Sequence, residues 1–252
     1  VRACIRAELP KVREGESFTK KLAAKGWLTM SWPKEYGGQG APHLRQLVYN
    51  EEMAYHRAPG QTMGADRVGP TLILFGTEEQ KAQFLPAIVG DEITWCQGFS
   101  EPGSGSDLAS LQTRAVRDGD CWVINGQKIW TSNAQRADYM ILLARTDPDA
   151  PKHRGITYFL VDMKLPGITV RPLVQMTGQA GFNEVFFDDV RVPANMVVGE
   201  VNRGWYVSTA TLDFERSGIG RVIGGLRTFE EVVAYAKATP AQIGRASCRE
   251  RV

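Results

Sequence analysis

The spacing of hydrophobic residues changes twice along this chain, and that change limits the folds it can adopt. Over residues 14–25 and 44–57, apolar side chains recur every three or four positions, which is typical of a helix with one buried face. From about residue 92 to 199, short β-rich runs alternate with turn residues instead. Helical spacing returns over about residues 205–237. The sequence therefore predicts helices, then strands, then one long helix.

Local signals place some of these elements more closely. Residues 77–80 (Thr-Glu-Glu-Gln) have the spacing of a capping box, so we expect a helix to begin there and run to residue 89. Asp-Gly at 118–119 and Asn-Gly at 125–126 each separate two β-rich runs, as hairpin turns do. The polar stretch 147–154 is expected to be a surface loop. Strands at this spacing favour a compact antiparallel barrel or sandwich.

The predicted fold class is α+β, with a helical domain over residues 1–91 and an antiparallel β-barrel or sandwich over 92–199. Residues 200–241 are expected to be the first helix of a C-terminal helical bundle that is otherwise missing. A lone helix needs partners for its apolar face, so we expect a truncated chain with an uncovered apolar stripe. Residues 242–252 drop the preceding pattern and resemble a translated sequencing adapter, which predicts a non-native tail with few contacts; a native flexible basic tail is the alternative.

Composition excludes several classes of function. A net charge of +2 and the absence of a long Lys/Arg block argue against a nucleic-acid partner. No stretch approaches the ~20 apolar residues of a membrane span. The four cysteines and three histidines are scattered without motif spacing, so we expect no disulfide framework and no metal site. A reducing, cytoplasmic location is the default expectation.

The densest chemical signal lies in two segments, residues 99–107 (FSEPGSGSD) and 126–133 (GQKIWTSN). The first predicts a strand that runs into a glycine-rich loop, whose hydroxyls and free backbone N–H groups can approach a ligand closely. The second predicts a strand that presents an aromatic ring beside two hydroxyls, which suits an aromatic ligand with polar edges. A polar surface turn and a core tryptophan are the structural alternatives. Neither segment has the spacing of a dinucleotide fingerprint or of a nucleophile elbow.

Residues 99–110 resemble a signature of the acyl-CoA dehydrogenase family, and the likeness extends over about residues 26–238. The further segments that fit in the same order are 26–41, 69–88, 126–133, 183–193 and 204–216. The resemblance implies an N-terminal helical domain, a middle β-domain and a C-terminal helical bundle. It also implies that FAD is bound between the last two.

The same resemblance implies the cofactor contacts. Ser100 would hydrogen-bond the pyrimidine side of the flavin near N1 and O2, where negative charge accumulates on reduction. Ser132 would lie near N5 and O4, and Trp130 would pack against the isoalloxazine. Phe99 and Thr131 would contribute backbone contacts.

The implied reaction is α,β-dehydrogenation of an acyl-CoA thioester, in which a carboxylate removes the α-proton and the flavin takes the hydride. Ser106 would touch the pantetheine arm, and Asp213 is a further substrate-binding candidate. One branch of the family carries the base on the first bundle helix, immediately before an arginine, which here gives Glu215 as base and Arg216 as its support. Other members carry the base further along the bundle. A solvated helix with Asp213 and Arg216 paired at i,i+3 is the structural alternative.

The resemblance further implies an electron-transfer flavoprotein as the electron acceptor. An acyl-CoA oxidase and a non-catalytic subunit of a paired dehydrogenase are the alternatives, since the same fold hosts both. A homo-oligomer or a paired hetero-oligomer is expected of the full-length protein. The acyl group of the substrate stays open.

Overall fold

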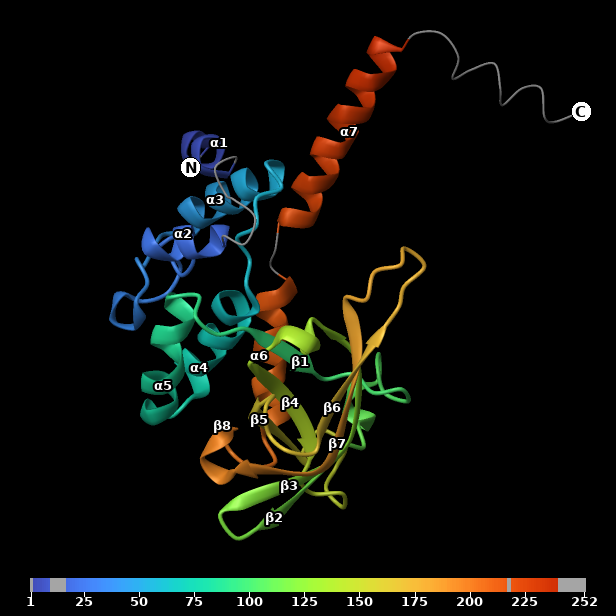
Figure 1. Cartoon of the computed structure of the whole chain (residues 1–252). Helices are drawn as coiled ribbons and strands as arrows, with labels where there is room; N and C mark the ends of the chain where they lie inside the picture. The colour runs from blue at the N-terminus through green and yellow to red at the C-terminus, as the bar shows by residue number, and fades with distance from the viewer. Residues whose placement is uncertain (1, 10–16, 217–218, 240–252) are drawn as a thin grey trace, which may run out of the picture. The chain divides into compact units, whose positions relative to one another are not determined.

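The computed structural model of the chain describes residues 2–9, 17–216 and 219–239 (Figure 1). Helices precede residue 90, strands lie between Trp95 and Val198, and helices resume at Gly204, so the predicted α+β order is confirmed. The predicted tail, 242–252, lies outside the described residues. The chain divides into two compact units. The first holds Val1–Phe18, Pro42–Gly60 and Gly218–Val252, and the second holds Thr19–Ala41 and Gln61–Ser217.

The first unit contains helices α1 (Arg2–Glu8), α3 (His43–Tyr55) and α7 (Gly220–Ala238). One side of α7 is tied to the end of α3, where the Tyr55 hydroxyl donates to Glu230 over 2.7 Å. α7 also carries exposed apolar side chains at three- and four-residue spacing: Val222, Leu226, Phe229, Val232 and Tyr235. This is the uncovered apolar stripe that the sequence predicts.

The second unit contains the remaining helices. These are α2 (Phe18–Ala24, which begins at the unit boundary), the π-helical turn η3 (Gly64–Val68), α4 (Gly69–Phe75), α5 (Glu78–Val89) and α6 (Gly204–Arg216), with short 3-10 turns at Lys34–Tyr36, Leu108–Ser110, Ala134–Arg136 and Ala194–Met196. The capping box of α5 is confirmed, because the Gln80 N–H donates to Thr77 Oγ1 and the Thr77 N–H donates to Gln80 Oε1, each over 3.2 Å. The single helix predicted over 205–237 is wrong, since α6 ends at Arg216 and α7 begins at Gly220. Gly220, the first residue of α7, contributes to the break because glycine disfavours helix.

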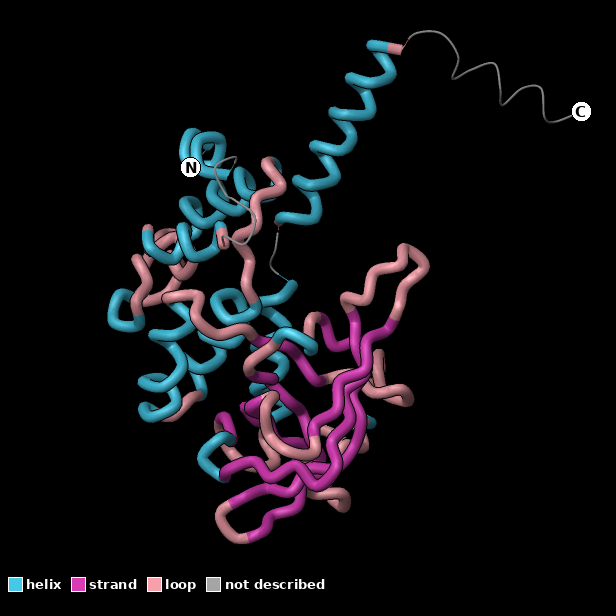
Figure 2. Tube along the Cα trace, in the orientation of Figure 1, coloured by secondary structure: helices cyan, strands magenta, loops and turns pink. Residues whose placement is uncertain are grey.

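The strands form one eight-stranded sheet in the order β6-β7-β3-β2-β4-β5-β8, with β1 paired to β4. The strands are β1 (Trp95–Gly98), β2 (Arg114–Asp118), β3 (Cys121–Ser132), β4 (Tyr139–Arg145), β5 (Ile156–Asp162), β6 (Ile168–Leu173), β7 (Phe182–Pro193) and β8 (Val197–Val198). Figure 2 shows them gathered into one body, from which the loop between β6 and β7 projects. The predicted surface loop at 147–154 connects β4 to β5.

The sheet departs from the expected antiparallel arrangement at β4, which has two parallel neighbours. β1 runs parallel to β4, with Trp95 opposite Tyr139 and Gly98 opposite Leu142, and β2 also touches β4 in parallel at Arg114. The other pairings are antiparallel. β1 reaches β4 through two intervening strands and a long loop, so no hairpin fixes its direction.

The turn predicted at the Asn-Gly pair 125–126 is wrong, because both residues lie inside β3. The pairing of β3 with β7 shifts register between Ile124 and Gly126, which marks a β-bulge. Gly126 has φ 148°, and a Cβ there would lie 2.7 Å from the Cα of Thr113. Glycine is therefore required by the close approach of Thr113, the residue before β2. The Asp-Gly pair at 118–119 is the predicted hairpin turn between β2 and β3.

The central strands β4 and β5 are buried on both faces. One face joins the core of the β-domain, in which Met140, Leu142 and Phe159 are fully buried. The other face is covered by α6, which also packs against η3 and α4. The sheet and the helix that carries Glu215 are thereby brought together. Within the described ranges, no helix combines the length and apolarity needed to cross a membrane.

Candidate functional site

The chain segment that follows β1 lies against β3. The Ile129 N–H donates to the Ser100 carbonyl over 2.9 Å, so Ser100 is next to the stretch that carries Trp130 and Ser132. Phe99 is buried, while Ser100 and Ser132 are half-buried. The structure thus brings together the two segments that the sequence singles out.

A second irregularity in β3 turns Trp130 outward. The register with β7 shifts between Lys128 and Thr131, and Trp130 adopts a left-handed φ of 60° within this shift. Its side chain is 60% exposed. The centroids of the Trp130 and Phe182 rings lie 6.2 Å apart, and the two rings are nearly perpendicular. Bulges of this kind re-aim side chains beside functional sites. Trp130 is therefore not the core tryptophan of the structural alternative.

Several polar groups around Trp130 lack partners. Within the described residues, the hydroxyls of Ser100 and Ser132 make no hydrogen bond, and Thr131 Oγ1 is buried without a partner. The backbone here is nevertheless fixed, because Asn183 Nδ2 donates to the Thr131 carbonyl over 2.9 Å. Buried polar atoms are normally satisfied, so the free groups fit a ligand with polar edges.

A chain of side-chain contacts connects this region to α6. The rings of Phe99 and of Tyr158, on β5, pack edge to face with their centroids 6.1 Å apart. The hydroxyl of Tyr158 shares a hydrogen bond of 3.4 Å with Thr211 on α6, and Thr211 shares another of 2.9 Å with Thr71. Burial raises the pKa of Tyr158, so its hydroxyl stays protonated. Glu215 lies one helical turn after Thr211 and therefore on the same side of α6.

Glu215 is held by a residue that the sequence did not single out. The guanidinium of Arg67, in the π-helical turn η3, lies 3.5 Å from Glu215 Oε1, and both side chains are about three-quarters buried (27% and 29% exposed). π-helical turns occur often at functional sites. Glu215 thus has a fixed electrostatic neighbour from another element.

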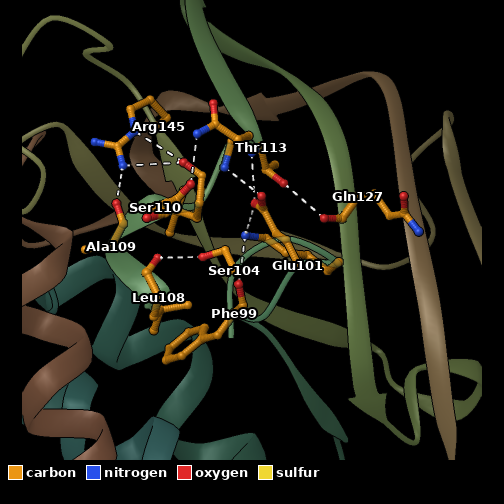
Figure 3. Close-up of polar contacts among 12 residues, drawn as sticks. Phe99, Glu101, Ser104, Leu108, Ala109, Ser110, Thr113, Gln127 and Arg145 are labelled. Atoms are coloured by element: carbon orange, nitrogen blue, oxygen red, sulfur yellow. Dashed lines mark hydrogen bonds and ion pairs between the residues drawn. The ribbon is translucent and has the colours of Figure 1, made fainter. Parts of the chain in front are cut away.

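A buried ion pair lies next to the end of β1. Figure 3 shows Glu101 between Phe99 and Thr113. Lys128 Nζ is 2.7 Å from Glu101 Oε1 and donates to the Phe99 carbonyl over 3.0 Å. Glu101 also accepts the N–H groups of Gln112 and Thr113, over 2.6 and 2.9 Å. Burial opposes the ionisation of Glu101, but Lys128 and these N–H groups outweigh it and hold the pKa of Glu101 below its usual value.

Three predicted site residues lie apart from this cluster. Ser106, Asp213 and Arg216 are exposed, and within the described chain none of their side chains has a hydrogen bond or ion pair. The i,i+3 pair between Asp213 and Arg216, which was the structural alternative, is thus not formed. The described residues also hold no group of three His, Cys, Asp or Glu that could bind a metal ion.

Two models of known protein families match most of the chain. Residues 1–92 match the family "Acyl-CoA dehydrogenase, N-terminal domain", and residues 96–190 match "Acyl-CoA dehydrogenase, middle domain". The chain belongs to the acyl-CoA dehydrogenase family. The two matches meet where the helices give way to β1.

Individual relatives agree. Acyl-CoA dehydrogenase IpdE1 of Mycobacterium tuberculosis is 47% identical over 90% of this chain, which spans 60% of that relative's length. A variant of the Tcur3481–Tcur3483 steroid ACAD has 43% identity and a TM-score of 0.85, with 94% of this chain and 67% of that chain covered. The ChsE4–ChsE5 complex from M. tuberculosis has 42% identity and a TM-score of 0.77, with 87% and 57% covered. The chain therefore corresponds to about three-fifths of an acyl-CoA dehydrogenase such as IpdE1.

Sequence reasoning missed Arg67, Tyr158 and the pair Glu101–Lys128. Lys128 had a usable signal, because it stands at an inward position of β3 among the buried residues Trp122 and Ile124. A charge at such a position requires a buried partner. The sequence held no such signal for Arg67, since only the fold of the acyl-CoA dehydrogenase brings η3 to α6.

Proposed function

We propose that this chain forms the N-terminal and middle parts of an FAD-dependent dehydrogenase that converts an acyl-CoA thioester to the 2-enoyl-CoA. One observation carries the proposal: Ser132 and the exposed Trp130 lie on the stretch of β3 whose Ile129 N–H holds the Ser100 carbonyl, and the hydroxyls of Ser100 and Ser132 have no partner within the described residues. An aromatic plane together with free hydroxyls suits a heteroaromatic ring system with polar edges. Family membership makes flavin the ring system to test.

The residues that would hold the cofactor lie on two neighbouring segments. Ser100 would donate to the pyrimidine edge, Ser132 would donate near N5 and O4, and Trp130 would pack against the ring system. Phe99 and Thr131 would contribute backbone groups. Since the backbone of these segments is fixed by β3 and by Asn183, the donors are preorganised. When bound, FAD would accept the hydride, which is chemistry that no amino-acid side chain supplies.

Glu215 would remove the α-proton of the thioester. A simple thioester is a weak carbon acid, so the site must stabilise the developing enolate and exclude water. Glu215 suits this role because its side chain is mostly buried and Arg67 holds it on the side of α6 that contacts Tyr158 through Thr211. Arg216 would support this part of the site electrostatically. The pantetheine arm would contact Ser106, and Asp213 would contact the substrate.

The relatives suggest the class of substrate and the assembly. One of the compared structures is a steroid ACAD, which favours a bulky polycyclic acyl group over a straight chain. Another is a complex of two different chains, which favours a paired hetero-oligomer, with a homo-oligomer as the alternative. We propose an electron-transfer flavoprotein as acceptor and a cytoplasmic location.

The test is direct. The protein is expressed from its complete reading frame, any bound flavin is released and identified, and acyl-CoAs of straight-chain and steroid type are added without oxygen. The proposal requires FAD and bleaching of the flavin absorbance by at least one acyl-CoA. Reoxidation by an electron-transfer flavoprotein, compared with reoxidation by oxygen, separates a dehydrogenase from an oxidase. A protein that binds FAD but is bleached by no acyl-CoA would be the non-catalytic subunit of a pair.

A further inference from the structure

Lys128 is a fully buried cation in the middle of β3, and the proposed function gives it no role. Its side chain has 0% exposure, and that of its partner Glu101 has 7%. Removing two charges from water is costly, and apolar side chains of similar size often stabilise a core as well or better. A buried pair is therefore weak support for a purely stabilising role, and the contacts of this pair suggest another.

The pair holds the backbone that carries Ser100. β1 ends at Gly98, and beyond it Lys128 Nζ donates to the carbonyl of Phe99 over 3.0 Å. The next residue of β3, Ile129, donates its N–H to the carbonyl of Ser100 over 2.9 Å. Two consecutive carbonyls are thus held by two consecutive residues of β3. The ammonium substitutes for a ladder donor at the point where regular pairing of β1 has ended.

The ion pair is also oriented. Glu101 is anchored by the N–H groups of Gln112 and Thr113, so the negative end of the pair points toward β2 and the positive end toward Phe99. The carbonyl of Phe99 and the N–H of Ser100 belong to one peptide unit, and the described chain contains no cis peptide bond. In a trans unit the N–H points away from the carbonyl. A cation at the carbonyl oxygen polarises the unit and makes that N–H a stronger donor.

We propose that Lys128, held by Glu101, is a positioning residue that fixes and polarises the Phe99–Ser100 peptide unit against the ligand bound by Ser100. This inference rests on the proposed function, in which that ligand is the pyrimidine edge of the flavin. Negative charge accumulates at that edge on reduction, so a polarised donor stabilises the reduced form more than the oxidised form. Lys128 thereby raises the reduction potential without touching the cofactor.

The charge of Lys128 can be titrated. Burial lowers its pKa to about 8, against the opposing attraction of Glu101. Arg145, on β4, adds to the lowering. Glu101 and Arg145 are the charged groups that act on Lys128 from the loop after β1 and from β4. Loss of the ammonium at high pH should remove the polarisation, which gives the proposal a signature in the reduction potential.

The experiment measures the flavin reduction potential against a reference dye, at pH values on both sides of 8, in the protein from the complete reading frame. The wild type should show an extra fall in potential as the pH passes through about 8. Lys128→Met should have a more negative potential below this pH and converge with the wild type above it. Each tenfold loss of preference for reduced flavin corresponds to about 30 mV for a two-electron couple. Glu101→Gln should move the fall to lower pH, because the ammonium loses its stabilising partner.

Lys164→Met is the matched control, because Lys164 lies on the surface of the β-domain with 80% side-chain exposure; it should keep the wild-type profile. A wild-type profile without the fall, or a fall that persists in Lys128→Met, overturns the inference. If Lys128→Met does not fold, the pH profiles of the reduction potential in the wild type and in Glu101→Gln decide whether the inference holds. A purely structural pair would weaken FAD retention without moving an inflection along the pH axis. A wild-type protein without FAD overturns the proposed function, and this inference with it.

Discussion

The guanidinium of Arg67 lies 3.5 Å from the carboxylate of Glu215, so the proposed base is paired with the π-helical turn η3. Its own helix offers Asp213 and Arg216, which are both exposed and unpaired within the described chain. Glu215 therefore differs from its neighbours on α6. It has a fixed position on the buried side, which is what a proton acceptor requires.

Glu215→Gln should abolish or greatly slow flavin reduction while FAD stays bound. The amide keeps the shape of the side chain but cannot accept the α-proton, and loss of a general base typically costs about 10²- to 10⁴-fold. The measurement is anaerobic bleaching in a stopped-flow instrument with saturating acyl-CoA. Glu200→Gln, in the exposed loop before α6, is the control and should bleach at the wild-type rate. A near-normal rate for Glu215→Gln would move the base elsewhere.

Arg67→Met should have a smaller effect on the same rate. A partly exposed ion pair contributes up to about 1 kcal/mol, so loss of the contact that orients Glu215 should slow bleaching by about fivefold at most. Arg67→Lys should retain part of the rate because it keeps the charge. Arg114→Met, on the exposed side of β2, is the control. A loss as large as that of Glu215→Gln would mean that Arg67 itself contacts the substrate.

The order of helices and strands could be predicted because hydrophobic period is a local property. The capping box at Thr77 and the hairpin turn at Gly119 follow from residues a few positions apart, and the structure contains both. The resemblance brought Ser100, Trp130 and Ser132 forward for the same reason, since each lies in a short contiguous segment. The structure adds that these segments are adjacent.

Features that depend on distant segments could not be predicted. The Asn-Gly pair at 125–126 has the local signature of a turn, but Thr113 packs so closely that the glycine serves a bulge. The parallel direction of β1 depends on a strand reached forty residues later. The partner of Glu215 comes from η3, which lies far away in the sequence. In each case a tertiary contact overrides or supplements the local signal.

Two tryptophans on β3 should respond oppositely to truncation. Trp122 is 7% exposed and belongs to the core, so Trp122→Ala should lower the free energy of unfolding by about 3–5 kcal/mol. Trp130 is 60% exposed, so Trp130→Ala should change that free energy by less than about 1 kcal/mol. Trp130→Ala should instead weaken FAD retention by about tenfold, through loss of ring packing. Urea unfolding and flavin release measure the two effects. A large loss of stability in Trp130→Ala would restore the core-tryptophan interpretation.

Two glycines on the β2–β3 hairpin provide a similar contrast. Gly119 has φ 60° with no atom within 4 Å of an added Cβ, so Gly119→Ala should cost about 1–2 kcal/mol, the strain of a left-handed residue. An added Cβ at Gly126 would lie 2.6 Å from Thr113 Oγ1 and 2.7 Å from its Cα, so the backbone at Thr113 would have to move. Gly126→Ala should therefore cost about 3 kcal/mol or more. It should also disturb Glu101, which Thr113 anchors. Equal losses of stability in the two variants would contradict the close approach.

The burial of Lys128 should give the free energy of unfolding an unusual dependence on pH. Burial lowers its pKa in the folded protein to about 8, whereas an unfolded lysine has a pKa of about 10.4. Between these values the unfolded chain holds a proton that the folded chain has released, so the free energy of unfolding rises with pH. A shift of this size corresponds to about 3 kcal/mol over the whole interval. Lys128→Met cannot titrate there. The free energy of unfolding of the wild type should therefore rise relative to that of the variant as the pH increases above 8, and the difference between the two should stay constant below pH 8. Urea unfolding at a series of pH values measures the difference, with Lys164→Met expected to follow the wild type. A difference that stays flat across the interval would mean that Lys128 titrates normally despite its burial.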